Sequence, residues 1–259
     1  MLVTPKHTND KHSNDSDELV KAYQIILNYA TDNMQVSDSE LDNFADTPVR
    51  AAKAFKEMIV PKKVIIQELN DILATGFPLE DSDEHTGIIT QGPINVYSLC
   101  PHHLIFVKYE AMIAYKPIKG GTVLGLSKLA RLAKLLGKRP VLQEQLTRDI
   151  ADALHWHERE NKQSVYKNKK GNIVKAEEAT ELALKLGDVI EIKYDNKNEL
   201  PQIASEGSAV QLLGKHHCMS CRGVKEDAVT LTTELRGVFK NSHLKDEFYQ
   251  AINSIRQAK

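Results

Sequence analysis

Residues 107–117, with the sequence VKYEAMIAYKP, have the period-2 spacing of apolar side chains that predicts a β-strand. Successive side chains of a strand point to opposite faces, so every second residue of this stretch falls on one side. The residues that share this face are Val107, Tyr109, Ala111, Ile113 and Tyr115. INVYSL, residues 94–99, predicts a second strand just before it. We therefore expect two neighbouring strands in this part of the chain.

Two helices are predicted after this strand pair. GLSKLARLAKLLGKRP has leucines at helical spacing and is ended by Gly137 and Pro140. VLQEQLTRDIADALHW, residues 141–156, has the same spacing. Two further strands and a final helix are predicted at residues 208–213, 227–239 and 244–257. Strands, two adjacent helices and strands again indicate an α+β domain with an antiparallel sheet.

The composition of the chain predicts its domain boundaries. Residues 1–17 are polar and are expected to form a disordered tail, and residues 18–87 form a predicted N-terminal helical region. Residues 88–259 form the predicted sheet domain. Within this domain, residues from about 155 to 206 are polar and rich in lysine and acidic residues. We interpret them as an insertion between the second helix and the next strand.

Charge and hydropathy exclude several classes of partner. The 259 residues carry a formal net charge of -1, so no general attraction to nucleic acid or to a membrane surface is expected. No apolar run approaches the roughly 18 residues of a membrane span. The N-terminus has no signal-peptide pattern, and three cysteines do not make a disulfide framework. A cytoplasmic location is therefore expected.

All three cysteines lie in two short segments that are rich in histidine. SLCPHH, residues 98–103, contains Cys100 and His103, whose spacing lets both side chains converge on one ion. GKHHCMSCRG, residues 214–223, supplies further thiols and imidazoles. Zn²⁺ accepts such mixed ligands, with three protein ligands in a catalytic site and four in a structural one. The two segments therefore predict a zinc site, and their residues are numerous enough for either kind.

Two other interpretations of these segments stay open on the residues alone. The histidines can be surface residues while the cysteines fill small core positions. Cys218 and Cys221 can also form a CxxC redox pair, although that interpretation gives SLCPHH no role.

Several motifs together resemble the GTP cyclohydrolase I family. They occur in the family's order, and the similarity runs from about Asp46 to the C-terminus apart from the predicted insertion. The motifs are SLCPHH, VLGLSKLARLAKLLGKRPVLQEQLT, HHCMSCRGV, TTELRGVF and DEF. The resemblance implies the tunnelling fold, in which antiparallel sheets of several subunits close into a barrel, with helices on one face of each sheet. It also implies a homo-oligomer, commonly a decamer, with active sites between subunits.

The resemblance implies a zinc-dependent conversion of GTP and water to formate and 7,8-dihydroneopterin triphosphate. The family's three zinc ligands correspond to Cys100, His103 and Cys218, and its acid/base pair to His102 and His216. Histidines suit this role because their ordinary pKa lies close to neutral pH. The resemblance leaves open whether the product feeds folate, tetrahydrobiopterin or deazaguanine synthesis.

The remaining site residues implied by the family bind the substrate. Glu144 corresponds to the carboxylate that binds the guanine edge, Gln143 is an adjacent candidate, and Ser127 corresponds to a catalytic serine near the ribose. Cations are required for the triphosphate. The basic residues that the resemblance assigns to it are Lys128, Arg131, Arg222 and Arg50, with the triphosphate expected to lie across a subunit boundary.

The chain also departs from the family pattern. Pro101 stands where many members have glutamate, Gln145 stands where an arginine is common, and the insertion is unusual. A zinc-binding scaffold without full turnover therefore remains an alternative to the full activity. So does a related enzyme of this fold that uses a different purine or stops at an early intermediate.

The third zinc ligand is a choice between two cysteines. The family register favours Cys218, which follows His216 by two residues. If both lay in one extended strand, their side chains would point to the same face, and Cys221 would point away. We therefore expect Cys218 to be the ligand.

Overall fold

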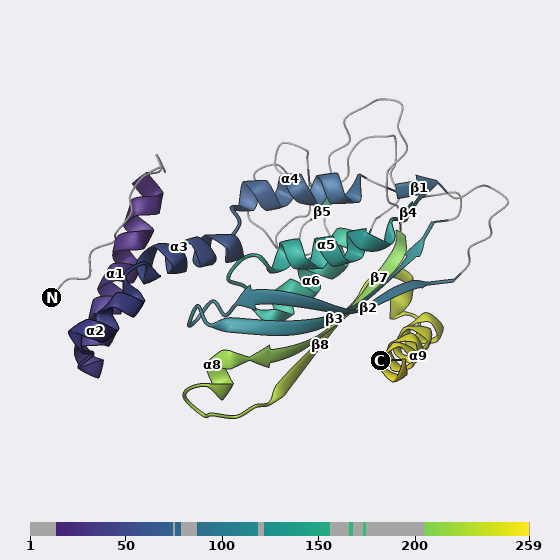
Figure 1. Cartoon of the computed structure of the whole chain (residues 1–259). Helices are drawn as coiled ribbons and strands as arrows, with labels where there is room; N and C mark the ends of the chain where they lie inside the picture. Colours follow the sequence, from purple (N-terminus) through teal and green to yellow (C-terminus); the bar gives the residue numbers. More distant parts are fainter. Residues whose placement is uncertain are drawn as a thin grey trace. The chain divides into compact units, whose positions relative to one another are not determined.

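The protein was analysed as a computed structural model, shown in Figure 1. The structure describes residues 14–74, 76–78, 87–118, 122–155, 166–167, 173–174 and 205–258. Most of the predicted tail and of the predicted insertion lies outside the described residues. The chain forms two compact units, Met1–Ile59 and Val60–Lys259.

The N-terminal unit is helical. Its elements are α1 (Asn14–Met34), α2 (Asp38–Leu41), the 3-10 helix η1 (Asp42–Phe44) and α3 (Thr47–Met58). The first helix begins within the stretch predicted to be a tail. It packs on α3, where the rings of Tyr23 and Phe55 meet edge to face at 6.2 Å between centroids. Burial of Leu27 and Ala52 adds an apolar contribution to this pairing.

The second unit is built on a four-stranded antiparallel sheet. Its order is β2-β3-β7-β8, and the strands are β2 (Ile89–Leu99), β3 (Phe106–Pro117), β7 (Ser205–His216) and β8 (Val229–Leu235). The prediction of an α+β domain with an antiparallel sheet is confirmed. One predicted strand is too long, because the chain turns after Leu235 into the 3-10 helix η2 (Gly237–Lys240).

One face of the sheet carries the main core. It is covered by α4 (Lys62–Leu73), α5 (Leu126–Gly137) and α6 (Gln143–Leu154). Alternate residues of β3, including Tyr109 and Tyr115, are fully buried there, as their spacing predicts. Short strands β1 (Gly76–Pro78) and β4 (Thr122–Leu124) pair separately, as do β5 (Tyr166–Lys167) and β6 (Ile173–Val174). Although α4 and β1 lie in the predicted helical region, they belong to the second unit.

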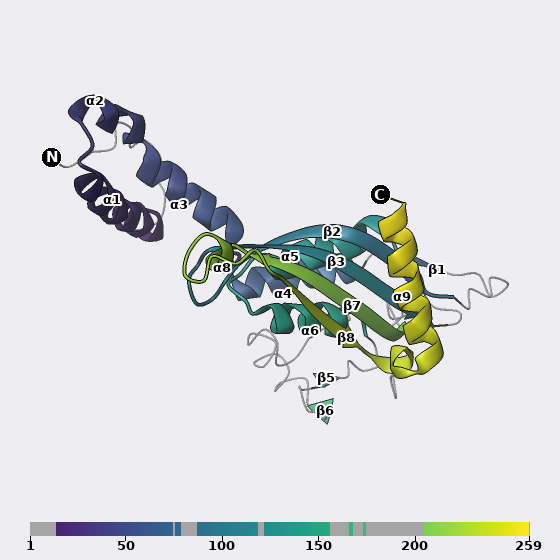
Figure 2. The ribbon, with the colours of Figure 1, turned by 90° about the horizontal axis from the view of Figure 1, so that it is seen from below.

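The opposite face of the sheet is also covered in part, so the expectation of helices on one face only is wrong. Helix α9 (Ser242–Gln257) lies across one end of the sheet, as Figure 2 shows. Its Phe248 and Ile252 share a buried cluster with Met112 and Ala114, whose side chains point away from those of the main core. Because β3 is apolar on both faces there, both faces need cover.

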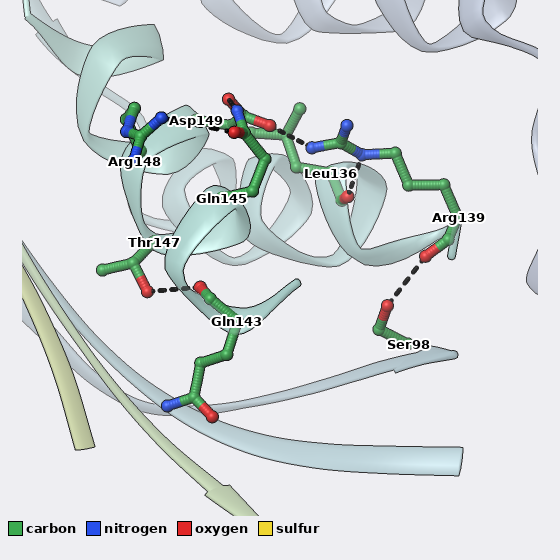
Figure 3. Close-up of polar contacts among 8 residues, drawn as sticks. All are labelled: Ser98, Leu136, Arg139, Gln143, Gln145, Thr147, Arg148 and Asp149. Atoms are coloured by element: carbon green, nitrogen blue, oxygen red, sulfur yellow. Dashed lines mark hydrogen bonds and ion pairs between the residues drawn. The ribbon is translucent and has the colours of Figure 1, made fainter. Parts of the chain in front are cut away.

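At the end of the sheet away from α9, several segments that are distant in the sequence contact one another. Leu99, the last residue of β2, forms a bridge with Pro140 in the connection between α5 and α6, and Val141 donates its N–H to the Leu99 carbonyl at 3.2 Å. The Ser98 hydroxyl donates to the Arg139 carbonyl at 2.8 Å (Figure 3). Val107 at the start of β3 pairs with His216 at the end of β7. The segments that carry the predicted site therefore converge at this end of the sheet.

None of the helices in the described ranges has the length and apolar character that a bilayer crossing needs.

Candidate metal centre and active site

Two thiols and one imidazole lie close together at the end of the sheet where β2 ends and β3 begins. The potential ligand atoms of Cys100, His103 and Cys218 all lie within 4.8 Å of one another. Cys100 and His103 come from one tight turn, closed by the Leu104 N–H donating to the Cys100 carbonyl at 2.8 Å. The thiols are buried and the imidazole is exposed. This group could hold a metal ion.

Cys218 reaches the cluster from a helical turn and not from a strand. Strand β7 ends at His216, and α8 (His217–Ser220) begins at once. The expectation that His216 and Cys218 share one face of an extended strand is therefore wrong. The turn nevertheless buries Cys218 beside Cys100, whereas Cys221 is exposed and lies outside the cluster.

The two thiols lie so close together that a cation between them would stabilise their thiolate forms. Burial, followed by the neighbouring Cys100, raises the pKa of the Cys218 thiol. Bringing two thiols together in this way disfavours thiolate formation unless a positive charge lies between them. A divalent cation supplies that charge and deprotonates its thiol ligands. Two sulfur donors and one nitrogen donor suit Zn²⁺ better than a hard cation such as Mg²⁺.

Two further histidines flank the cluster. His102 is exposed, and its Nδ1 lies 3.8 Å from the Cys100 Sγ. His216 is half-buried, and its ring meets that of Tyr109 edge to face at 6.0 Å between centroids. Burial lowers the pKa of His216 and outweighs the opposing effect of Glu144, so the imidazole is neutral at pH 7.

Three more predicted residues lie at this end of the unit. Glu144 is exposed in the first turn of α6 and is close enough to influence the pKa of His216. Arg222 is exposed just after α8 and acts to lower the pKa of Cys218. Gln143 is only 2% exposed, and hydrogen bonds within the protein occupy its amide.

Ser127, Lys128 and Arg131 lie toward the other end of α5. The last residue of this helix, Gly137, packs against Val96 and the Tyr97 carbonyl close to the cluster end of β2. At 1.5 Å per residue, the first turn of α5 begins about 15 Å further along the helix. Within one chain, Ser127 and Lys128 therefore lie at the end of α5 away from the cluster, and Arg131 lies midway along the helix.

Arg50 belongs to the N-terminal unit, where it is exposed and lies 4.0 Å from Asp46. Its role at the site remains a prediction from the family pattern alone.

Sequence interpretation missed two residues beside His216. Tyr109 is fully buried, and its hydroxyl makes no hydrogen bond within the described part of the chain. Burial and the nearby Cys100 and Glu144 raise the pKa of Tyr109, so its hydroxyl remains protonated. Gly214 pairs with Tyr109 across β3 and β7 and leaves room for its ring. A glycine inside a strand, two residues before a candidate catalytic histidine, was the available signal.

Comparison with known proteins places this arrangement in a family. The family model described as GTP cyclohydrolase I matches residues 21–170 and 197–253. The break in the match, residues 171–196, falls within the stretch interpreted as an insertion. The chain belongs to the GTP cyclohydrolase I family.

Curated relatives cover most of the chain. GTP cyclohydrolase 1 of Corynebacterium glutamicum (strain R) is 32% identical over 206 residues, which are 79% of each chain. GTP cyclohydrolase 1 of Mycobacterium avium (strain 104) is 34% identical over 199 residues, or 76% of this chain and 72% of the relative. GTP cyclohydrolase 1 of Thermoanaerobacter pseudethanolicus is 29% identical over 242 residues, or 93% of this chain and 98% of the relative.

Proposed function

We propose that this protein hydrolyses and rearranges GTP to formate and 7,8-dihydroneopterin triphosphate. The observation that carries the proposal is the cluster of Cys100, His103 and Cys218 with two further histidines beside it, in a chain of the GTP cyclohydrolase I family. The reaction needs water to attack carbon 8 of guanine and needs protons for the ring nitrogens as the five-membered ring opens. The site offers groups for both demands.

The cluster residues fit Zn²⁺ as the resident ion. Cys100 and Cys218 would hold it as thiolates, and His103 through a ring nitrogen. When bound, zinc supplies the Lewis acidity that activates water at neutral pH. The three free thiols also favour a reducing compartment, such as the cytoplasm.

His102 and His216 are the proposed proton carriers. Neither belongs to the ligand cluster, yet both lie beside it. His216 is neutral near pH 7 because burial lowers its pKa, so it can accept a proton from the reacting groups and return it to a ring nitrogen. An imidazole is suited to both steps because its two protonation states lie close in free energy at this pH.

Glu144 is the proposed guanine ligand. Its carboxylate is exposed at the start of α6 and can accept hydrogen bonds from the two donors on the guanine edge, N1–H and the N2 amino group. This charge-assisted pairing would distinguish guanine from adenine, which presents a different edge. Arg222, exposed near the cysteines, is placed to meet a phosphate of the same nucleotide.

The remaining substrate residues are proposed to act across a subunit boundary. Ser127, Lys128 and Arg131 lie along α5 away from the cysteines of their own chain, so they would serve the site of a neighbouring subunit, with Arg50 also assigned to the triphosphate. Strands β2 and β8 form the edges of the four-stranded sheet. Pairing such edges between subunits removes unpaired backbone groups. We therefore propose a barrel-forming homo-oligomer, a decamer by family pattern.

The direct test is to incubate the purified protein with GTP and identify the products by mass spectrometry, alongside metal analysis and light scattering. We expect about one zinc per chain, formate, and dihydroneopterin triphosphate from a large oligomer. Unchanged GTP in zinc-loaded protein would support a scaffold role. Accumulation of a formamidopyrimidine nucleotide would indicate an enzyme that stops after ring opening. A monomer would contradict the shared site.

Cys218 and Cys221 provide a matched pair for the metal assignment. Cys218→Ser replaces a buried thiol of the cluster and should abolish both zinc binding and turnover. Cys221→Ser changes an exposed thiol three residues away and should keep most of both. Zinc retained by the first variant and lost by the second would show that the assignment is wrong.

A further inference from the structure

The Gln143 side chain extends from the first turn of α6 toward the strands, as Figure 3 shows. Its Nε2 donates to the Thr230 carbonyl at 2.9 Å and lies 3.1 Å from both the Leu212 carbonyl and the Thr232 hydroxyl. Its Oε1 lies 2.8 Å from Nε2 of His216. A residue expected beside the guanine is therefore bonded to the sheet on one side and to a candidate catalytic histidine on the other.

The surrounding oxygens determine which way the Gln143 amide points. The Thr147 hydroxyl donates its proton to the Gln143 carbonyl at 2.7 Å, so its oxygen accepts from Thr232, 2.6 Å away. The Thr232 hydroxyl has then used its own proton and can only accept from Gln143. Three acceptors thus surround the amide nitrogen, and turning the amide over would place its oxygen against all three.

The orientation of this amide sets the proton position on His216. Because Oε1 of Gln143 can only accept, the His216 Nε2 must carry the hydrogen. We propose that Gln143 is a positioning residue, resting on the proposed function, which holds His216 as the Nε2–H tautomer with Nδ1 left as the nitrogen that exchanges protons with the substrate. A histidine in the other tautomer would present no acceptor at that nitrogen.

Gly214 makes this contact possible. It lies in β7 two residues before His216, and a Cβ at this position would overlap the Gln143 amide oxygen and approach the Tyr109 ring at 2.9 Å. The contact atoms belong to a packed side chain, and the Gln143 amide is held on its other side by the sheet. Gly214→Ala therefore displaces the amide oxygen from His216 without changing either partner.

The proposal separates Gln143 from its neighbour Glu144. The two residues are consecutive in α6, but Glu144 is exposed whereas Gln143 is buried. A guanine-binding glutamine would have to give up its bonds to Thr230 and His216, leaving buried groups without partners. The buried amide therefore acts on the substrate through the imidazole.

A double-mutant cycle tests the proposal on the full-length, zinc-loaded protein. Gln143→Met keeps the side-chain length and should lower kcat for GTP about 10-fold, the worth of one hydrogen bond, with KM within about 2-fold. In a His216→Ala background the same change should cause no further loss, because its effect passes through that imidazole. A raised KM with unchanged kcat, or losses that multiply in the double variant, would overturn the proposal.

Two variants exclude a general effect on folding. Gly214→Ala should reproduce the fall in kcat, since it displaces the same amide. Gln145→Met removes an amide from the same turn of α6 that is bonded to Asp149, and it should leave kcat unchanged. A loss with Gln145→Met equal to that with Gln143→Met would show that the effect is only structural.

A readout without GTP separates this proposal from the proposed function. Crystal structures of the wild type should show the His216 ring in one orientation on Gln143, and those of Gln143→Met and Gly214→Ala should show the ring turned or in several orientations. An unchanged ring in both variants would reject the positioning role even if GTP is turned over. An ordered ring in wild type that turns in the variants, in a protein without GTP turnover, would reject the proposed function alone.

Discussion

Two polar networks include residues of helix α6. They differ in the part of the protein to which they connect this helix. The Gln143 network consists of Gln143, Thr147, Thr232 and His216 and faces the sheet. The Arg139 network consists of Arg139, Asp149 and Gln145 and faces α5. In Figure 3, Gln143 extends toward the strands, whereas Gln145 and Asp149 lie on the side of the helix that faces Arg139.

The Arg139 network joins α6 to the end of α5. Arg139 pairs with Asp149, which also accepts from Gln145 at 2.6 Å, and the Arg139 Nε donates to the Leu136 carbonyl at 3.0 Å. The Gln143 network instead ends on an imidazole beside the candidate metal cluster. One network therefore joins two helices, and the other holds the imidazole that we propose as a proton carrier. Variants in the Arg139 network should mainly lower stability, whereas variants in the Gln143 network should mainly lower turnover.

The largest effect is expected from breaking the Arg139 network. Asp149→Ala removes a buried carboxylate and leaves Arg139, mostly buried as well, without its partner. The free energy of unfolding should fall by about 3–5 kcal/mol, as measured by denaturant titration. Zinc content and kcat per folded chain should stay near wild type. A large fall in kcat with unchanged stability would show that Asp149 acts on turnover, as we expect of the Gln143 network.

A double variant sharpens this result. Burial raises the pKa of Asp149 and outweighs the effect of Arg139, so ionising this carboxylate in the folded protein is costly. Arg139→Met combined with Asp149→Leu should therefore regain most of the stability lost by either single change. If the double variant is as unstable as Asp149→Ala, the pair makes a net contribution that apolar packing does not replace.

The second-largest effect is expected at the end of the Gln143 network. His216→Ala should lower kcat by about 10²-fold or more, because it removes a proposed proton carrier. Zinc should be retained, since the cluster consists of Cys100, His103 and Cys218 and does not include His216. Metal analysis and steady-state kinetics measure the two quantities separately. Loss of zinc together with activity would indicate that His216 is itself a ligand.

A smaller effect is expected from the middle of the same network. Thr232→Val keeps the shape of the side chain but removes the hydroxyl between Gln143 and Thr147. The free energy of unfolding should fall by about 1 kcal/mol, with a modest fall in kcat, because Gln143 retains its two carbonyl acceptors. Thermal unfolding and kinetics on one preparation measure both. Complete loss of turnover would mean that the backbone acceptors do not hold the amide.

The smallest effect is expected from Gln145→Ala. This residue donates to Asp149 but is only one of that carboxylate's partners. The free energy of unfolding should fall by about 0.5 kcal/mol, at the low end for one hydrogen bond, and turnover should not change. A fall as large as that of Asp149→Ala would show that Gln145, and not Arg139, dominates the network.

The sequence predicted the elements whose signal is local. The alternation of β3 places Tyr109 and Tyr115 in the core, and Gly137 ends α5 as its lack of a side chain suggests. The cluster residues came from motif resemblance, and the structure brings those three together. These features depend on neighbours in the chain or on recognisable spacing, which is why a single sequence revealed them.

Features that depend on distant contacts were not predicted. Cover of the second sheet face by α9 was missed, although the continuous apolar run AMIAY, residues 111–115, is typical of a strand buried on both sides. The turn at Cys218 was taken for a strand, since HHCM has no helix signal of its own. The role of Gln143 depends on partners 69 to 89 residues away, beyond the reach of any local pattern.

The hydrogen bonds between β2 and the α5–α6 connection bear on the size of base that the site would accept. Hydrogen bonds at Ser98 and Leu99 tie the base of the cysteine turn to residues 139–141, directly before α6. Cys100 and Glu144 therefore lie close in sequence to two segments that are hydrogen-bonded to each other. In the proposed function, Glu144 binds the pyrimidine edge of guanine while carbon 8 faces the cysteine cluster, so the bound base would have to span both. A single-ring base has no carbon 8 and would therefore not meet both demands.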